Sequence, residues 1–174
     1  MLNLFKKKYT IEELNLFGFM SRLRHFEKLT FEEMALFTQH MYLRTYNQNE
    51  VVFFRGDPSY ALYIVKNGLV SLTIDVKDKF EELTSVSSCH TFGDNSFLEH
   101  SERIYSSIIT SEKADLYVIP QANIHEIFES HPRIKAKIMT SFAELYNEYT
   151  SNLFKIYKST FGFFELGMVY NNRH

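Results

Sequence analysis

One short stretch of the chain, residues 92–107, carries the residue types that bind an anion, and we call it the cassette. It opens with Phe92-Gly93-Asp94, where a glycine before a short acid predicts a tight turn leading into a helix. The first backbone N–H groups of a helix have no acceptor inside it, and they attract an anion. Arg103 then offers a planar guanidinium that can hold two phosphate oxygens. The cassette is therefore predicted to hold one phosphate.

Two helices are expected before the segments that carry the cassette. The spacing of a capping box, a threonine followed three residues later by glutamate, occurs at Thr10 and again at Thr30. Apolar residues at helical spacing follow both signals. The pattern predicts one helix over residues 10–24 and a shorter one over residues 30–40.

The middle of the chain, residues 42–119, changes to β-branched and aromatic runs separated by Gly-Asp-Pro and Asn-Gly turns. This alternation predicts short antiparallel strands, typical of a sandwich, jelly roll or barrel. We expect them at residues 50–54, 61–65, 69–74, 81–89, 105–110 and 114–119. Two further helices should open at Pro120 and Pro132, the second running to about residue 159.

Size and composition favour one folded domain. The chain has 174 residues, 45% of them hydrophobic, and a formal net charge of −2, which argues against a basic face for nucleic acid. No apolar run is long enough to span a membrane. The single cysteine, Cys89, cannot form an internal disulfide, and no secretory signal opens the chain, so we expect a cytoplasmic protein. The expected organisation is N-terminal helices (9–40), β-barrel (42–119), C-terminal helices (120–159) and tail (160–174).

No pattern of a catalytic or metal site is found. The seven histidines are scattered, without the close His-x-His pairs or supporting carboxylates of a metal-binding cupin. A nucleophile elbow, a P-loop and a dinucleotide fingerprint are also absent from the sequence. We expect neither an enzyme nor a bound metal or cofactor.

These pieces together resemble the cyclic nucleotide-binding domain family, which includes catabolite activator proteins, kinase regulatory subunits and gated channels. The resemblance spans roughly residues 23–159 and rests on Phe92-Gly93-Asp94, on Arg103, on the glycine turns at Gly56 and Gly68, and on the two proline-opened helices. It implies a jelly-roll β-barrel with flanking helices. It also implies a regulatory, or sensor, domain whose ligand is cyclic AMP or cyclic GMP.

The resemblance implies which residues meet the nucleotide. Asp94 stands where the family usually has a glutamate that binds the ribose hydroxyl, and Arg103 stands at the arginine that pairs with the cyclic phosphate. Tyr149 and Thr150, on the last helix, are suited to stack on and hydrogen-bond to the base. The whole implied ligand-binding set is Gly93, Asp94, Asn95, Ser96, Phe97, Arg103, Tyr105, Ser106, Tyr149 and Thr150.

The cassette also departs from the family pattern. Glu102 replaces a proline, and Ile104 and Tyr105 replace small residues that would line the pocket, so Tyr105 could fill it. One residue too many separates Arg103 from the next strand. Either a bulge near residues 105–107 absorbs it, or Arg103 turns to solvent. Asp94, likewise, either binds a ribose or caps the short helix.

The last helix carries apolar residues at alternating spacings of four and three, with a second apolar line beside them. This pattern favours a homodimer through residues 133–159. The family often adds a DNA-reading helix-turn-helix, for which the residues after this helix are too few, so we expect no direct DNA binding. Two hypotheses follow: a sensor whose ligand shifts the C-terminal helices, or a degenerate, ligand-free member acting as a dimeric structural or protein-interaction module with a partner yet to be named.

Overall fold

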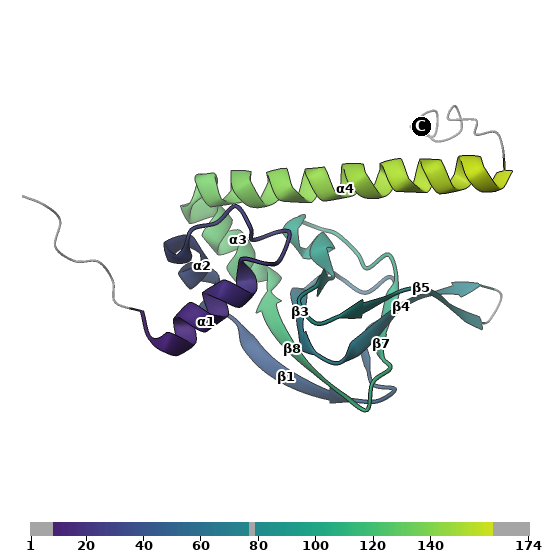
Figure 1. Ribbon diagram of the computed structural model, residues 1–174, viewed down its shortest axis with the longest axis horizontal. Helices are drawn as coiled ribbons and strands as arrows, with labels where there is room; N and C mark the ends of the chain where they lie inside the picture. The colour runs from purple at the N-terminus through teal and green to yellow at the C-terminus, as the bar shows by residue number, and fades with distance from the viewer. Residues whose placement is uncertain (1–8, 77–78, 162–174) are drawn as a thin grey trace, which may run out of the picture.

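The computed structural model describes residues 9–76 and 79–161 (Figure 1). Residues 1–8, 77–78 and 162–174, which include most of the predicted tail (160–174), lie outside the described residues. The helices are α1 (Ile11–Met20), α2 (Phe31–Thr38), α3 (Gln121–Ser130) and α4 (Pro132–Phe161). The strands are β1 (Tyr42–Asn47), β2 (Val51–Phe53), β3 (Ala61–Asn67), β4 (Leu69–Val76), β5 (Lys79–Ser87), β6 (Thr91–Phe92), β7 (Ser106–Ile109) and β8 (Lys113–Pro120), with the 3-10 turn η1 (Asp94–Phe97) between β6 and β7.

The strands form two four-stranded antiparallel sheets, in the orders β1-β8-β3-β6 and β2-β7-β4-β5. Side chains from both sheets meet in one apolar core, to which Val65 and Leu116 contribute from the first sheet and Val70 and Ile109 from the second. The predicted jelly roll is confirmed. The two sheets do not close into one hydrogen-bonded cylinder, because each keeps its own ladder and the two pack face to face.

Both predicted capping boxes are present. The hydroxyl of Thr10 accepts from the N–H of Glu13, and the carboxylate of Glu13 accepts from the N–H of Thr10; Thr30 and Glu33 make the same reciprocal pair. Helix α1 is shorter than predicted, because it ends at Met20 and the chain continues in tight turns. These turns bury residues 23, 25 and 26 together, which one face of a helix could not do.

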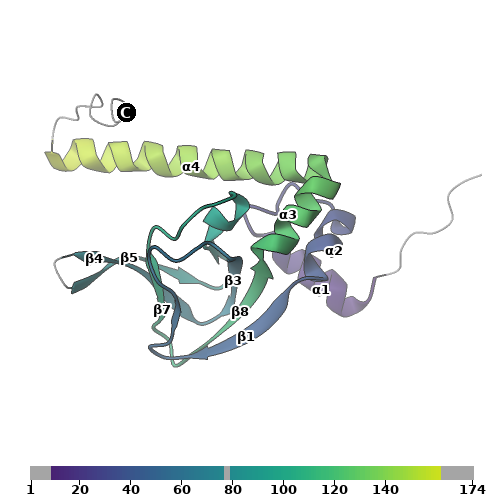
Figure 2. The same ribbon diagram turned by 180° about the vertical axis from the view of Figure 1, so that it is seen from behind.

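Helix α4 runs across one side of the sandwich, and its C-terminal half extends beyond the body of the sandwich on the side where the β4–β5 hairpin also projects (Figures 1 and 2). Its first half packs on the domain, since Ile138 is fully buried and Leu145 is 7% exposed. Its second half is exposed. Two ion pairs at the surface, Lys28 with Glu144 and Arg24 with Glu148, join the turns after α1 to α4.

The extra residue of the cassette is absorbed without turning Arg103 to solvent. The backbone bends at Ile104 and Tyr105 before β7 begins, and the β2–β7 ladder shifts register between Val51 and Phe53. The side chain of Arg103 is consequently directed inward and is 3% exposed.

Candidate functional site

A cavity of about 500 Å³ lies where β4, β5, the cassette and α4 meet. Asp94 and Tyr105 line it from the cassette, Leu83 and Val86 from β5, and tyrosines from α4. A volume of this size is ordinary for a small-molecule site. The loop that carries Asp94 is fixed by Gly93, whose φ of 72° is in the left-handed region and lets the chain turn into η1.

Asp94 is the buried acid of this cavity, and its side chain is 13% exposed. Burial raises the pKa of the carboxyl group, although hydrogen bonds from Tyr146 and from backbone N–H groups of Asp94 and Asn95 act in the opposite direction. The backbone contacts place the carboxylate at the start of η1. The anion position at this helix start is therefore close to a carboxylate that belongs to the chain itself.

His25, from the turns after α1, lies behind Asp94. Its Nε2 is 3.6 Å from a carboxylate oxygen of Asp94, and its Nδ1 is 3.0 Å from the hydroxyl oxygen of Thr91. Burial and the nearby charge of Arg24 lower the pKa of His25 to about 4, in spite of the acid beside it. Near neutral pH the imidazole is uncharged, so it gives Asp94 no full positive partner.

Arg103 lies inside the sandwich and does not line the cavity. One terminal nitrogen, Nη1, donates to the carbonyl oxygen of Gly93 at 2.8 Å, and Nη2 donates to that of Ala61 at 2.6 Å. The guanidinium carbon sits 4.1 Å from the ring centroid of Phe53 and 5.6 Å from that of Tyr63. Arg103 thus ties the start of the cassette to β3 through two charge-assisted hydrogen bonds, and its cation–π contacts lie on rings of β2 and β3.

Tyr105 occupies the wall of the cavity beside Gly93. Its hydroxyl oxygen accepts a hydrogen bond from the backbone N–H of Gly93 at 2.9 Å, so this donor is already used. Burial and the charge of Asp94 raise the pKa of Tyr105, which keeps the phenol neutral.

Helix α4 closes the remaining side with two tyrosines. The hydroxyl group of Tyr146 lies 3.5 Å from the carboxylate of Asp94, and the rings of Tyr146 and Tyr149 are 6.1 Å apart between centroids. Tyr149 is 56% exposed, at the open edge of the cavity. Any molecule bound beside Asp94 would meet α4.

This arrangement matches a known family: the family model described as the cyclic nucleotide-binding domain matches residues 43–131, just over half of the chain. The chain belongs to the cyclic nucleotide-binding domain family. The match covers the two sheets from residue 43 on, the cassette and α3. It therefore includes every element that lines the cavity except α4.

Relatives of this cyclic nucleotide-binding domain occur in larger proteins. It is 28% identical over 119 residues to a protein of Rhodopseudomonas palustris described as a potassium channel, covering 68% of this chain and 28% of that protein. The chain thus spans less than a third of that relative. The catabolite activator protein of Thermus thermophilus has the same fold, with a TM-score of 0.64, 23% identity, and coverage of 76% of this chain and 62% of that one. The regulatory domain of Toxoplasma gondii PKA, crystallised with cAMP, has a TM-score of 0.63 at 17% identity, covering 70% of this chain and 46% of that one.

The cyclic nucleotide-binding domain brings only part of the predicted site together. Asp94, Tyr105 and Tyr149 line the cavity, and Gly93 donates to Tyr105. The remaining members lie outside the cavity. Ser96 and Phe97 are buried in the core beside α3 and α4, and Asn95 has a buried side-chain oxygen. Arg103 donates to carbonyl groups, Ser106 accepts from the N–H of Arg55, and Thr150 donates to the carbonyl oxygen of Tyr146 on an exposed side of α4.

Sequence reasoning missed two residues whose side chains contact Asp94, namely Tyr146 and His25. Tyr146 precedes Tyr149 by three positions, the spacing that places two side chains on one face of a helix, so periodicity could have found it. His25 carried no such signal. It reaches Asp94 only because the turns after α1 pack against the cassette and α4.

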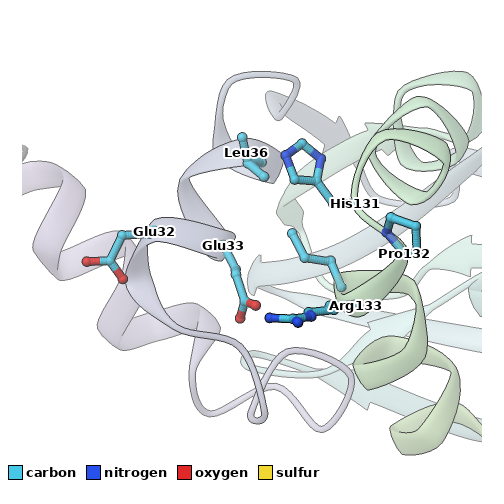
Figure 3. Close-up of a pocket in the computed structure, with 7 residues that line it drawn as sticks. Glu32, Glu33, Leu36, His131, Pro132 and Arg133 are labelled. Atoms are coloured by element: carbon cyan, nitrogen blue, oxygen red, sulfur yellow. The ribbon is translucent and has the colours of Figure 1, made fainter.

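A second hollow, of about 690 Å³, lies away from the cassette between α2 and the junction of α3 with α4 (Figure 3). Glu32, Glu33 and Leu36 line one side, and His131 and Arg133 line the other. Glu33 is already engaged, because its carboxylate caps α2 and accepts from the ammonium group of Lys137 at 2.7 Å. One of the two acids of this hollow is therefore already paired within the domain.

No three His, Cys, Asp or Glu side chains within residues 9–76 and 79–161 are grouped so that they could hold a metal ion. Among the helices of the same described ranges, none is both long and apolar enough to cross a bilayer.

Proposed function

We propose that this chain is a regulatory domain that binds a cyclic nucleotide in the cavity beside Asp94, and that binding changes the position of α4. The observation that carries this proposal is the contact between the Tyr146 hydroxyl, on α4, and the Asp94 carboxylate, on the cassette. A ligand that uses Asp94 for its ribose hydroxyl competes with Tyr146. Binding would therefore favour a state in which α4 sits differently against the cassette.

The cyclic phosphate would need hydrogen-bond donors of the cassette, and in this structure these donors already have acceptors within the protein. Arg103 would exchange the carbonyl oxygens of Gly93 and Ala61 for phosphate oxygens, and the N–H of Gly93 would exchange the Tyr105 hydroxyl for phosphate. Each donor keeps one hydrogen bond, but the carbonyl oxygens of Gly93 and Ala61 lose the guanidinium, so the cost includes these lost partners as well as the rearrangement of the cassette. The proposed ligand-binding residues are Gly93, Asp94, Arg103, Tyr105 and Tyr149.

Calorimetric titration of the full chain with cyclic AMP and cyclic GMP tests this proposal. We expect heat of binding with at least one nucleotide, and altered hydrogen exchange in α4 when that nucleotide is bound. Arg103→Ala should abolish the heat, whereas Arg55→Ala, which removes an exposed arginine three residues from the Pro58–Glu102 bridge, should leave it unchanged. Absence of heat at high micromolar nucleotide, in protein shown to be folded, contradicts the proposal.

A second candidate function has an observation of its own in favour. Arg103 is held by two carbonyl oxygens and two aromatic rings, and Tyr105 covers the Gly93 N–H, which is the arrangement expected of a domain that no longer binds phosphate. Such a domain would work as a ligand-free structural or interaction module. The same titration separates the two candidates.

We further propose that α4 forms a homodimer, under either candidate. Its second half presents Tyr149, Leu153 and Ile156, which are 56%, 62% and 63% exposed and follow each other at spacings of four and three. This is the spacing of a coiled-coil seam. A second copy of the helix would cover these side chains and connect the cavity of one subunit to its partner.

A further inference from the structure

The cavity beside Asp94 has the wrong charge for an anion in the state described. Among the described residues that line it there is no lysine or arginine, and the one acid, Asp94, faces it. Tyr105 and Tyr146 are neutral, since burial and the charge of Asp94 raise the pKa of both phenols. A phosphate that enters the cavity therefore meets the Asp94 carboxylate, which repels it, before Arg103 has rearranged.

Asp94 has no cation of its own. His25 is uncharged near neutral pH, and Tyr146 supplies only a neutral hydroxyl at 3.5 Å. The charge of Arg103 favours the carboxylate from a distance, yet its hydrogen bonds go to the carbonyl oxygens of Gly93 and Ala61. A buried carboxylate without a full positive partner is costly, and a bound cation would reduce that cost.

The walls around Asp94 are aromatic. Phe92 and Tyr105 line the cavity from the cassette, and Tyr146 and Tyr149 line it from α4. The faces of such rings attract cations, most strongly where water is excluded. A cation–π contact of this kind is present inside the sandwich, where the guanidinium carbon of Arg103 lies 4.1 Å from the ring centroid of Phe53.

We infer that this cavity binds a small organic cation, an alkylammonium or quaternary ammonium compound, between the Asp94 carboxylate and the tyrosines of the cassette and α4. The volume of about 500 Å³ accommodates a compound of this size. The inference concerns the same cavity as the proposed function but does not depend on cyclic nucleotide binding. Both ligands would occupy the same cavity beside Asp94, so the two ligands exclude each other.

The test compares choline and benzyltrimethylammonium with the uncharged isostere of choline, in which carbon replaces the nitrogen. Chemical shifts of the full-length protein are followed by NMR at constant ionic strength. We expect one of the two cations to shift the resonances of cavity residues and to bind at least about tenfold tighter than the isostere. Equal binding of choline and its isostere, or no shift with either cation up to tens of millimolar in folded protein, overturns the inference.

Variants locate the effect. Asp94→Asn should remove the preference for the cation over the isostere, and Tyr149→Ala, a change at a half-exposed side chain, should weaken cation binding by at least about threefold without unfolding the domain. Glu99→Gln removes an exposed carboxylate of the cassette outside the cavity and should change neither. If Asp94→Asn and Glu99→Gln lower cation affinity equally, the attraction is a general surface effect and the inference fails. A parallel titration with cyclic AMP reports on the proposed function alone, because the cation result is read without nucleotide.

Discussion

The hydroxyl oxygen of Tyr105 accepts the backbone N–H of Gly93 at 2.9 Å, across the point where the cassette turns into η1. The tyrosine thereby does two things at once. It satisfies a buried donor of the turn, and it covers a donor that could otherwise face an anion. The bulk that departs from the family pattern at this position is thus part of how the cassette is stabilised.

Tyr105→Phe keeps the ring and removes the acceptor, so the N–H of Gly93 is left buried without a partner. We expect the free energy of unfolding to fall by about 1–3 kcal/mol, measured by urea denaturation. Tyr60→Phe is the matched control, because the Tyr60 side chain is 71% exposed and should tolerate the change. Equal stability of the two variants would show that the Tyr105 hydroxyl does not support the turn.

Gly93→Ala should destabilise the domain more than Gly56→Ala. Both glycines have positive φ, 72° and 85°, so both variants carry the backbone strain of an alanine in that region. A Cβ at Gly93 would lie 2.5 Å from Nη1 of Arg103, whereas a Cβ at Gly56 meets nothing within 4 Å. The expected difference in the free energy of unfolding is about 1–3 kcal/mol.

A double variant checks the cause of that difference. If the guanidinium is what the new methyl group meets, Gly93→Ala should cost less in an Arg103→Ala background than in the parent protein. If the losses in free energy of unfolding are strictly additive, the contact between the new methyl group and Arg103 is not what destabilises the variant, and Arg103 does not stabilise the turn.

Stability should fall on acidification through His25. Its pKa is lowered in the folded protein from 6.5 to about 4, so the unfolded chain takes up the proton first and stability declines as the pH falls through this window. The loss should reach about 3 kcal/mol by pH 4. His25→Gln should lose stability at neutral pH, because packing and the contact with Thr91 change, yet its stability should depend less on pH.

The comparison with His25→Gln matters because Asp94 acts in the opposite sense. Burial raises the pKa of Asp94, so this group costs stability as the pH rises and its proton is lost. The difference between parent and variant isolates the histidine. His100→Asn, an exposed position with positive φ that asparagine tolerates, is the control and should keep the parent's pH profile. An unchanged profile in His25→Gln would contradict the burial argument.

The fold was readable from local signals that tertiary packing did not override. Thr10 and Thr30 begin helices where their capping boxes indicated, and Pro132 begins α4. The end of α1 could not be predicted from local signals, because the turns after Met20 depend on the burial of Leu23 and Phe26 against elements distant in the sequence. Two strands were also missed: β1 (Tyr42–Asn47) and β6, the shortest, whose two residues carry no periodicity.

The site was less readable than the fold, and Arg103 shows why. Its identity and its spacing from Phe92 suggested a phosphate partner. The direction of its side chain, however, depends on how the backbone accommodates the one extra residue between Arg103 and β7. The bend at Ile104 and Tyr105 turns Arg103 toward two carbonyl oxygens that belong to β3 and to the cassette turn. A guanidinium can donate to carbonyl oxygens as well as to phosphate oxygens, so residue type alone could not show which of them Arg103 meets.

The last prediction concerns the exposed seam of α4, formed by Tyr149, Leu153 and Ile156. Leu153→Glu should weaken self-association by at least about a hundredfold, measured by sedimentation equilibrium, because a two-fold interface places the buried charge on both copies. Ser151→Glu introduces the same charge on an exposed polar position two residues away, which points to another side of the helix, and should leave association intact. A parent protein that stays monomeric at high micromolar concentration would contradict the dimer. Equal weakening by both variants would show that net charge, and not the seam, controls association.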